Sequence, residues 1–97
     1  MVSDLKGISY VIISFNSSAK VLEEIAQIQK ENNCDWQCVI LDNGSNDETN
    51  MVARRLVDKD LRIRYIFQQK QAIEIAKRNA TAVCKFEDIY FIYLAND

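Results

Sequence analysis

Short apolar runs in the sequence alternate with segments whose apolar residues recur every three or four positions. The run at residues 8–14 is rich in β-branched and aromatic residues, and a second apolar run at 38–41 leads directly into turn formers. Both runs predict strands, and the second is expected to be buried on both faces. Residues 62–67 alternate at first, as an edge or half-exposed strand does, and residues 89–94 predict a fourth strand.

Amphipathic helices are predicted in the three segments between these strands. Apolar residues fall at helical spacing between Val21 and Ile28, between Val52 and Val57, and between Ala72 and Cys84. Ser17 or Ser18 can cap the first helix. Residues 45–48, Ser-Asn-Asp-Glu, fit a capping box at the start of the second helix. In that motif the Ser45 hydroxyl accepts from an amide of the first turn and Glu48 reaches back to the cap amide.

The predicted order of elements, β-α-β-α-β-α-β, is typical of an α/β fold. Strands that alternate with helices of this length are joined by right-handed crossovers, so we expect a mostly parallel four-stranded sheet with helices on both faces. Residues 1–97 are expected to form a single domain, and residues 34–36 to form the connection into the second strand. Such Rossmann-like sheets bind their ligands beyond the carboxyl ends of the strands.

Polar residues, with one aromatic residue among them, gather where the predicted strands end. They are Ser14, Phe15 and Asn16, then Asp42 and Asn43, then Gln68 and Gln69, and finally Asn96 and Asp97. Because the carboxyl ends of parallel strands meet at one edge of a sheet, we expect these side chains to converge. The pattern of strands and helices does not by itself name a ligand.

Composition and charge limit the class of partner. Of the 97 residues, 48% are hydrophobic and 27% are charged, which is ordinary for a soluble globular domain. Twelve basic and fourteen acidic residues give a net charge of −2, so there is no electrostatic case for nucleic acid or an anionic membrane as a partner. The chain has no His, so any chemistry rests on carboxylates, amides, hydroxyls, thiols, Arg or Lys.

The three cysteines, Cys34, Cys38 and Cys84, do not form a disulfide framework. Their odd number favours a reducing compartment, and neither a signal peptide nor an apolar run of ~18 residues is visible, so we expect a cytoplasmic protein. The spacing of Cys34 and Cys38 is not that of a zinc or redox pair. We interpret the cysteines as small residues of the core or its boundary.

Motifs of several other α/β families are absent. The turn after the first strand, residues 14–18, contains no Gly, so both the dinucleotide motif G-x-G-x-x-G and the phosphate loop are missing. A receiver-type phosphoacceptor domain would carry an acidic pair after its first strand, and this chain does not. Serine and cysteine triads are excluded because there is no His.

Five side chains remain as candidates for ligand contact, each with a structural alternative. Asp42 could accept hydrogen bonds from a ligand or build the turn that follows it. Phe15 could stack on a flat ring or pack in the core. Asn96 and Asp97 could offer oxygen atoms to a hard divalent cation or form a frayed terminus. Arg78 could contact phosphate or be a solvated surface charge.

Five blocks of the sequence, in order, resemble the amino-terminal half of the inverting family 2 glycosyltransferases, which have the GT-A fold. The blocks are Tyr-Val-Ile-Ile-Ser-Phe-Asn at 10–16, Val-Ile-Leu-Asp-Asn-Gly-Ser-Asn-Asp at 39–47, Arg-Ile-Arg-Tyr-Ile at 62–66, Ala-Lys-Arg-Asn at 76–79 and Tyr-Phe-Ile-Tyr-Leu-Ala-Asn-Asp at 90–97. The second block is the most specific, and together the blocks span nearly the whole chain.

The resemblance implies a nucleotide-sugar donor, most often a UDP-sugar, whose sugar passes with inversion to a hydroxyl of a saccharide or lipid-linked acceptor. By resemblance, Ser14 and Phe15 would lie against the base, with Phe15 stacking on it. Asp42 would accept a hydrogen bond from the base, and Arg78 would lie toward the base and the diphosphate.

The resemblance also implies a divalent cation, Mn²⁺ or Mg²⁺. Asn96 and Asp97 would fall at the family's acidic motif, with contacts to the ribose, and Asp97 would contact the metal that bridges the diphosphate. The metal would neutralise the charge that builds on the leaving group. The chain departs from the family in having Ala95 where many members carry Asp, and in having no Gly in residues 68–72.

The family's acceptor half and catalytic carboxylate lie downstream of the acidic motif, so no catalytic residue is assigned in this chain. We therefore expect a fragment that keeps the donor-binding half and is inactive by itself. The alternative is a non-catalytic α/β binding or interaction module. In either case an exposed apolar area or an unpaired strand edge is expected to cause some self-association.

Overall fold

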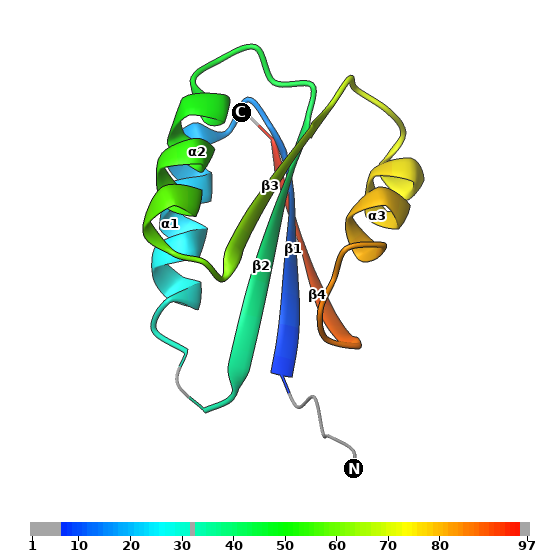
Figure 1. Cartoon of the computed structure of the whole chain (residues 1–97). Helices are drawn as coiled ribbons and strands as arrows, with labels where there is room; N and C mark the ends of the chain where they lie inside the picture. The colour runs from blue at the N-terminus through cyan, green and yellow to red at the C-terminus, as the bar shows by residue number, and fades with distance from the viewer. Residues whose placement is uncertain (1–6, 32, 96–97) are drawn as a thin grey trace.

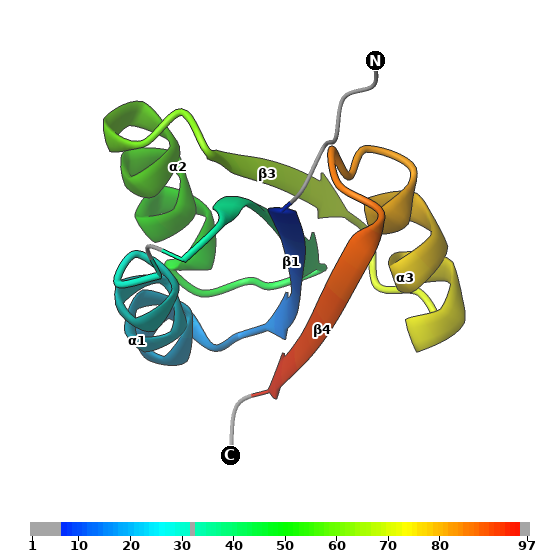
Figure 2. The same ribbon diagram turned by 90° about the horizontal axis from the view of Figure 1, so that it is seen from below.

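The computed structural model describes residues 7–31 and 33–95 as one parallel sheet with helices on both faces (Figures 1 and 2). The elements are β1 (Gly7–Phe15), α1 (Ser18–Ile28), β2 (Asp35–Asn43), α2 (Thr49–Lys59), β3 (Ile63–Gln68), α3 (Ile73–Thr81) and β4 (Asp88–Ala95). The strand order is β3-β2-β1-β4, and each neighbouring pair is parallel. The predicted α/β fold and order of elements are confirmed.

The two faces of the sheet are covered unequally. Helices α1 and α2 lie on one face and α3 lies on the other, as the view in Figure 2 shows. Alternate residues along each strand supply the two cores. Ile12 and Ile40 belong to the core under α1 and α2, whereas Val11 and Val39 belong to the core under α3. The sheet is therefore buried on both sides at its centre, as its apolar strands predicted.

Strand β2 is the most deeply buried element. Every residue of β2 after Asp35 is buried, and Cys38 is completely inaccessible. The prediction that residues 34–36 form a connection is wrong for Asp35 and Trp36, which pair with Gly7 and Ile8 of β1. An exposed Asp at the first position of a strand breaks the apolar pattern without breaking the backbone pairing. For this reason the strand is longer than the apolar run.

The predicted capping box before α2 is wrong. The N-cap of α2 is Glu48, which makes no side-chain capping bond. The Ser45 hydroxyl instead accepts a hydrogen bond from the Asn16 backbone N–H at 2.8 Å, and the Glu48 carboxylate accepts one from the Ser18 hydroxyl at 3.3 Å. Asp47 accepts from the Thr49 backbone N–H at 2.9 Å. The polar residues after β2 therefore connect two neighbouring loops more than they cap a helix.

Two other helix ends also differ from expectation. Ser17 does occupy the N-cap of α1, but its hydroxyl donates to the Phe15 carbonyl at 2.8 Å and makes no capping bond. Helix α3 ends at Thr81, three residues before the predicted end at Cys84. Cys84 follows in a turn, where its N–H donates to the Thr81 carbonyl at 3.1 Å. Apolar spacing persisted beyond the helix because Val83 and Cys84 still pack on the core.

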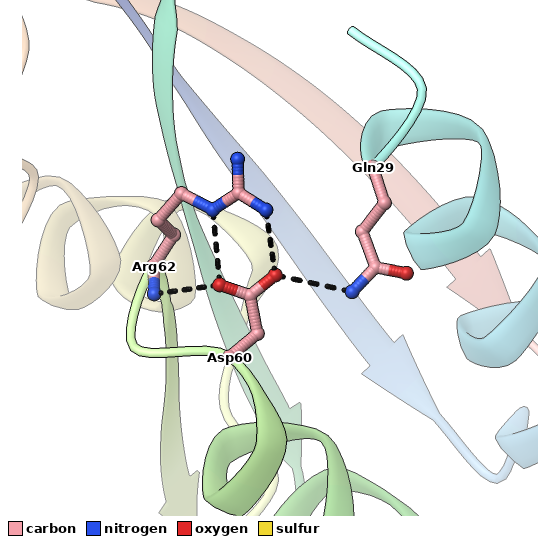
Figure 3. Close-up of polar contacts among 3 residues, drawn as sticks. All are labelled: Gln29, Asp60 and Arg62. Atoms are coloured by element: carbon pink, nitrogen blue, oxygen red, sulfur yellow. Dashed lines mark hydrogen bonds and ion pairs between the residues drawn. The ribbon is translucent and has the colours of Figure 1, made fainter.

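A polar cluster joins α1 to the segment between α2 and β3. Arg62 makes a two-pronged contact with Asp60, through Nε at 3.0 Å and Nη2 at 2.9 Å, and Gln29 donates to the same carboxylate at 3.1 Å (Figure 3). These hydrogen bonds lower the pKa of Asp60 to about 2, and the one from the Arg62 side chain has the largest effect. The guanidinium also lies 3.8 Å from the Trp36 ring centroid. Trp36 is buried in the core.

Two further properties concern the described part of the chain as a whole. Cys34, Cys38 and Cys84 are free thiols. In residues 7–31 and 33–95 there is no helix with the length and apolar character that a membrane crossing requires.

Candidate functional site

A cavity of about 430 Å³ opens at the carboxyl ends of the strands. Its walls come from the ends of β1, β2 and β4 and from the segment that leads into α3. The lining residues are Ile13, Ser14, Phe15, Asn43, Lys70, Gln71, Ala72, Ile73, Tyr93, Leu94 and Ala95. This is the edge of the sheet at which the sequence predicted a ligand site, and the lining is mostly apolar with a few polar groups, as in many ligand pockets.

Ser14 borders this cavity at the end of β1, but the alternation of side chains along the strand directs its hydroxyl to the face of the sheet that carries Asp42. The residue is completely buried, and its Cα is in register with Asp42 of β2 and Leu94 of β4. Within residues 7–31 and 33–95 the Ser14 hydroxyl has no hydrogen-bond partner. A buried hydroxyl without a partner costs about 1–3 kcal/mol, so this atom is a candidate contact for a ligand that lies across the carboxyl edge of the sheet.

Phe15 is the last residue of β1, and its ring meets a cation. The ammonium of Lys70 lies 3.9 Å from the centroid of the Phe15 ring. Both residues line the cavity, and the aromatic side chain is partly exposed. Phe15 belongs to neither of the two core clusters of the described residues, so its position at the cavity differs from the core packing given as its alternative.

Asn43 and Gly44 position the segment that carries Lys70. The Asn43 side chain accepts from the Gln71 backbone N–H and donates to the Gln71 carbonyl, both at 3.0 Å. It also accepts from the Gln68 side chain at 2.9 Å. Gly44 has φ +88°, and a Cβ at this position would lie 2.8 Å from the Lys70 backbone nitrogen. Only glycine tolerates both this conformation and this approach.

Asp42 lies on the other face of the sheet and does not line the cavity. It is completely buried, and both carboxylate oxygens have partners within the chain. Oδ1 accepts from the Ser45 backbone N–H at 2.9 Å, and Oδ2 accepts from the Tyr65 hydroxyl at 2.6 Å. The alternative predicted for Asp42, that it builds the turn, therefore has direct contacts in its favour.

Tyr65 holds Asp42 from the neighbouring strand β3. Burial, together with the hydrogen bond to the Asp42 carboxylate, raises the pKa of Tyr65 to about 12. The Asn50 side chain donates to the same phenolic oxygen at 3.1 Å. The apolar pattern of residues 62–67 marked Tyr65 only as a strand residue, and no local signal pointed to its pairing with Asp42.

The remaining predicted site residues are not brought to the cavity within the described ranges. Arg78 lies on the exposed face of α3 and is not part of the cavity wall. Asn96 and Asp97 lie outside the described residues. Among residues 7–31 and 33–95, no cluster of three or more Cys, Asp or Glu side chains is arranged to hold a metal ion.

Lys70 is a candidate ligand contact that the sequence did not predict. It is the one charged residue among the described residues that line the cavity. Residues 68–72 were noted only for their lack of Gly. The available signal was Gly44: a glycine at the end of a buried strand can mark the close approach of another backbone, and here that backbone is the one at Lys70.

The fold is that of a Rossmann-like α/β protein, and it carries a cavity at the carboxyl edge of its parallel sheet. The family model described as glycosyl transferase family 2 matches residues 9–97, nearly the whole chain. The chain therefore belongs to glycosyl transferase family 2. A comparison with curated proteins gave no match.

Proposed function

We propose that this chain forms the donor-binding part of an inverting glycosyltransferase, which binds a nucleoside diphosphate sugar, a UDP-sugar first, at the carboxyl edge of the sheet. The observation that carries the proposal is the cavity at the carboxyl edge of the sheet, which the aromatic ring of Phe15 lines, with the unpartnered hydroxyl of Ser14 beside it on the opposite face of β1. An aromatic ring suits a nucleobase, and a buried hydroxyl suits its polar edge or the ribose.

The proposed metal is Mn²⁺ or Mg²⁺, and the proposed ligand is Asp97. The oxygen atoms of Asp97 and Asn96 are of the kind that hard divalent cations prefer, and the two residues directly follow β4, whose last residue lines the cavity. When bound, such a cation supplies Lewis-acid stabilisation of the leaving diphosphate. The role of the described residues is to bind and orient the nucleotide.

Asp42 and Arg78 are also proposed as donor contacts, each on a different observation. The Asp42 carboxylate has lone pairs left after its two internal hydrogen bonds, but it is completely buried on the face away from the cavity, so it can accept one only from a base that reaches across the carboxyl edge of the sheet. Because Asp42 also holds Ser45 and Tyr65, we assign it a second role in positioning the loop after β2. Arg78 is exposed on α3, where a long side chain can reach toward a ligand.

The proposed transfer is to an acceptor hydroxyl, on a saccharide or a lipid-linked acceptor. No catalytic base is assigned in this chain, and by itself the chain is proposed to bind a donor without transferring the sugar. The three free thiols fit a reducing compartment, and we propose the cytoplasm.

Calorimetric titration with UDP and GDP, with and without Mn²⁺, tests the donor site. We expect weak binding that strengthens with the metal. The Phe15→Leu variant should bind several-fold more weakly, whereas Phe67→Leu, at an exposed aromatic residue of β3, should bind like the unmodified protein. Absence of heat with every nucleotide, at protein concentrations that reveal millimolar binding, would exclude the donor site.

A non-catalytic binding module is the second candidate. The internal use of both Asp42 oxygens favours it, since a carboxylate committed to Tyr65 and Ser45 has a sufficient structural reason to be present. The Asp42→Asn variant separates the two candidates, provided that circular dichroism shows a folded protein. A loss of UDP binding by the folded variant supports the donor site, and unchanged binding supports a purely structural Asp42.

A further inference from the structure

We propose that Lys70 is a specificity-determining residue: it covers the face of Phe15 on which a base would stack, and it leaves that face only when a phosphate group draws its ammonium away. The inference rests on the donor site proposed above. It makes the cavity select phosphorylated nucleosides over free nucleosides, and it assigns that selection to one side chain.

The first step of the argument is competition for one ring face. The Lys70 ammonium is 3.9 Å from the Phe15 centroid, and a ring stacked on the same face would have its centroid about 4.5–7 Å away, so the ammonium fills the space such a base would take. Both side chains line the cavity, so the covered face is the one that borders it. A base and the ammonium cannot occupy this face together, and a nucleoside must therefore displace the lysine to bind.

The second step is that the backbone of Lys70 is fixed while its side chain is held weakly. Asn43 holds the adjacent Gln71 by two backbone hydrogen bonds, and Gly44 packs against the Lys70 nitrogen. In the described part of the chain, no carboxylate forms a salt bridge with the Lys70 ammonium. A cation–π contact at an exposed site is weak, so the ammonium can move while its attachment point stays in place.

The third step is charge. Lys70 is the one charged residue of the described cavity wall, and its charge is positive. A diphosphate offers the ammonium a stronger partner than the ring does, because a hydrogen bond between two charged groups exceeds a surface cation–π contact. Phosphate binding and release of the ring face are therefore coupled through the same side chain.

Two variants test the coupling. Lys70→Gln removes the charge, and Lys77→Gln is the matched control, because Lys77 makes a similar contact with the Phe91 ring at 4.7 Å but does not line the cavity. Calorimetry would use uridine, UDP and inorganic pyrophosphate. We expect Lys70→Gln to weaken UDP binding about tenfold or more. The same variant should strengthen uridine binding about two- to fivefold, because the ring face is then free. Lys77→Gln should change neither.

A second measurement follows the Lys70 side chain itself, and its pyrophosphate arm does not depend on nucleotide binding. The ε-methylene protons of Lys70 should resonate at unusually high field over the Phe15 ring and return to ordinary shifts when UDP or pyrophosphate is added. If UDP and uridine fail to bind but pyrophosphate shifts the Lys70 signals, the proposed donor site is wrong, whereas the release of the Phe15 ring by an anion is supported. If Lys70→Gln weakens uridine and UDP equally, or if saturating UDP or pyrophosphate leaves the lysine signals unchanged, the inference is wrong.

Discussion

The Tyr65 hydroxyl donates a hydrogen bond of 2.6 Å to Oδ2 of Asp42, across the neighbouring strands β3 and β2. The carboxylate is completely buried, and its other oxygen accepts from the Ser45 backbone N–H. The sequence marked Asp42 as a ligand contact, and in the structure its carboxylate is an internal acceptor that joins strand β3 and the loop after β2. Its substitution affects the fold as well as any ligand.

The Tyr65→Phe variant removes one of these bonds without changing the size of the ring. We expect a loss of about 1–3 kcal/mol in the free energy of unfolding, because one oxygen of a buried carboxylate loses its partner. Urea unfolding followed by circular dichroism measures this. Tyr93→Phe, at an exposed tyrosine of β4, is the control and should lie within about 0.5 kcal/mol of the unmodified protein. Equal stability of the two variants would contradict a structural role for the bond.

Stability at alkaline pH should depend on the same tyrosine. The folded protein holds the Tyr65 proton up to a pKa of about 12, whereas the unfolded chain releases it near 10. Between these values the unfolded state binds fewer protons, so the free energy of unfolding falls as the pH rises from about 10 to about 12. The Tyr65→Phe variant should show a shallower decline in urea titrations over this range. Parallel curves would mean that Tyr65 titrates alike in both states.

Acid stability should depend on Asp60. Its pKa is lowered from 3.8 to about 2, so its contribution is complete above 3.8 and is lost as the pH falls toward 2. The Asp60→Asn variant should be less stable at neutral pH and should lose less stability on acidification through this window. Asp58→Asn, an exposed position on α2, serves as the control. A variant curve with the same slope as the unmodified protein would show that the Arg62 contact does not affect folding.

Gly44→Ala tests the approach of the Lys70 segment. The substitution combines a φ of +88° with a Cβ that would lie 2.8 Å from a backbone nitrogen, so we expect a loss of at least about 1–2 kcal/mol. Thermal unfolding measures this loss, and Asn46→Ala, an exposed neighbour in the same loop, should be close to neutral. An unchanged melting temperature for Gly44→Ala would mean that the loop moves without cost.

The outer edge of β4 is expected to drive self-association. Residues 89–95 carry no charge, Tyr90 and Tyr93 are 60% and 50% exposed, and no strand within residues 7–31 and 33–95 pairs with this edge. Charged residues are a common protection of such edges. Light scattering should therefore show mass increasing with concentration, and Tyr90→Lys should reduce it. Phe67→Lys, at the opposite edge, is the control, and a monomer at all concentrations would contradict the prediction.

The fold was predictable because each element carries its own local signal. Apolar runs and helical spacing predicted all seven elements in their order. The resemblance to the glycosyltransferase family implied the same architecture. The strand order β3-β2-β1-β4 was not predicted, since the notable pairing of β1 with β4 joins residues about 80 positions apart, such as Ile8 and Asp88.

The candidate site was predictable only in part. Ser14 and Phe15 were predicted as contacts because they end a strand, and both residues border the cavity. The alternation of side chains along β2 assigns Asp42 to one face and Asn43 to the other, but strand ends alone do not say which face holds the cavity. Lys70 was missed because its position depends on a contact with Gly44, 26 positions earlier in the chain.

The burial of Cys38 makes the alkylation of its thiol a natural measure of how often the central sheet opens. Its thiol is inaccessible at the centre of β2, and burial raises its pKa, so an alkylating reagent can react only after the strand becomes exposed. Cys34 and Cys84 are partly accessible and react outside this constraint. The rate at which Cys38 is alkylated therefore measures how often the central sheet opens, and no label has to be introduced into the protein.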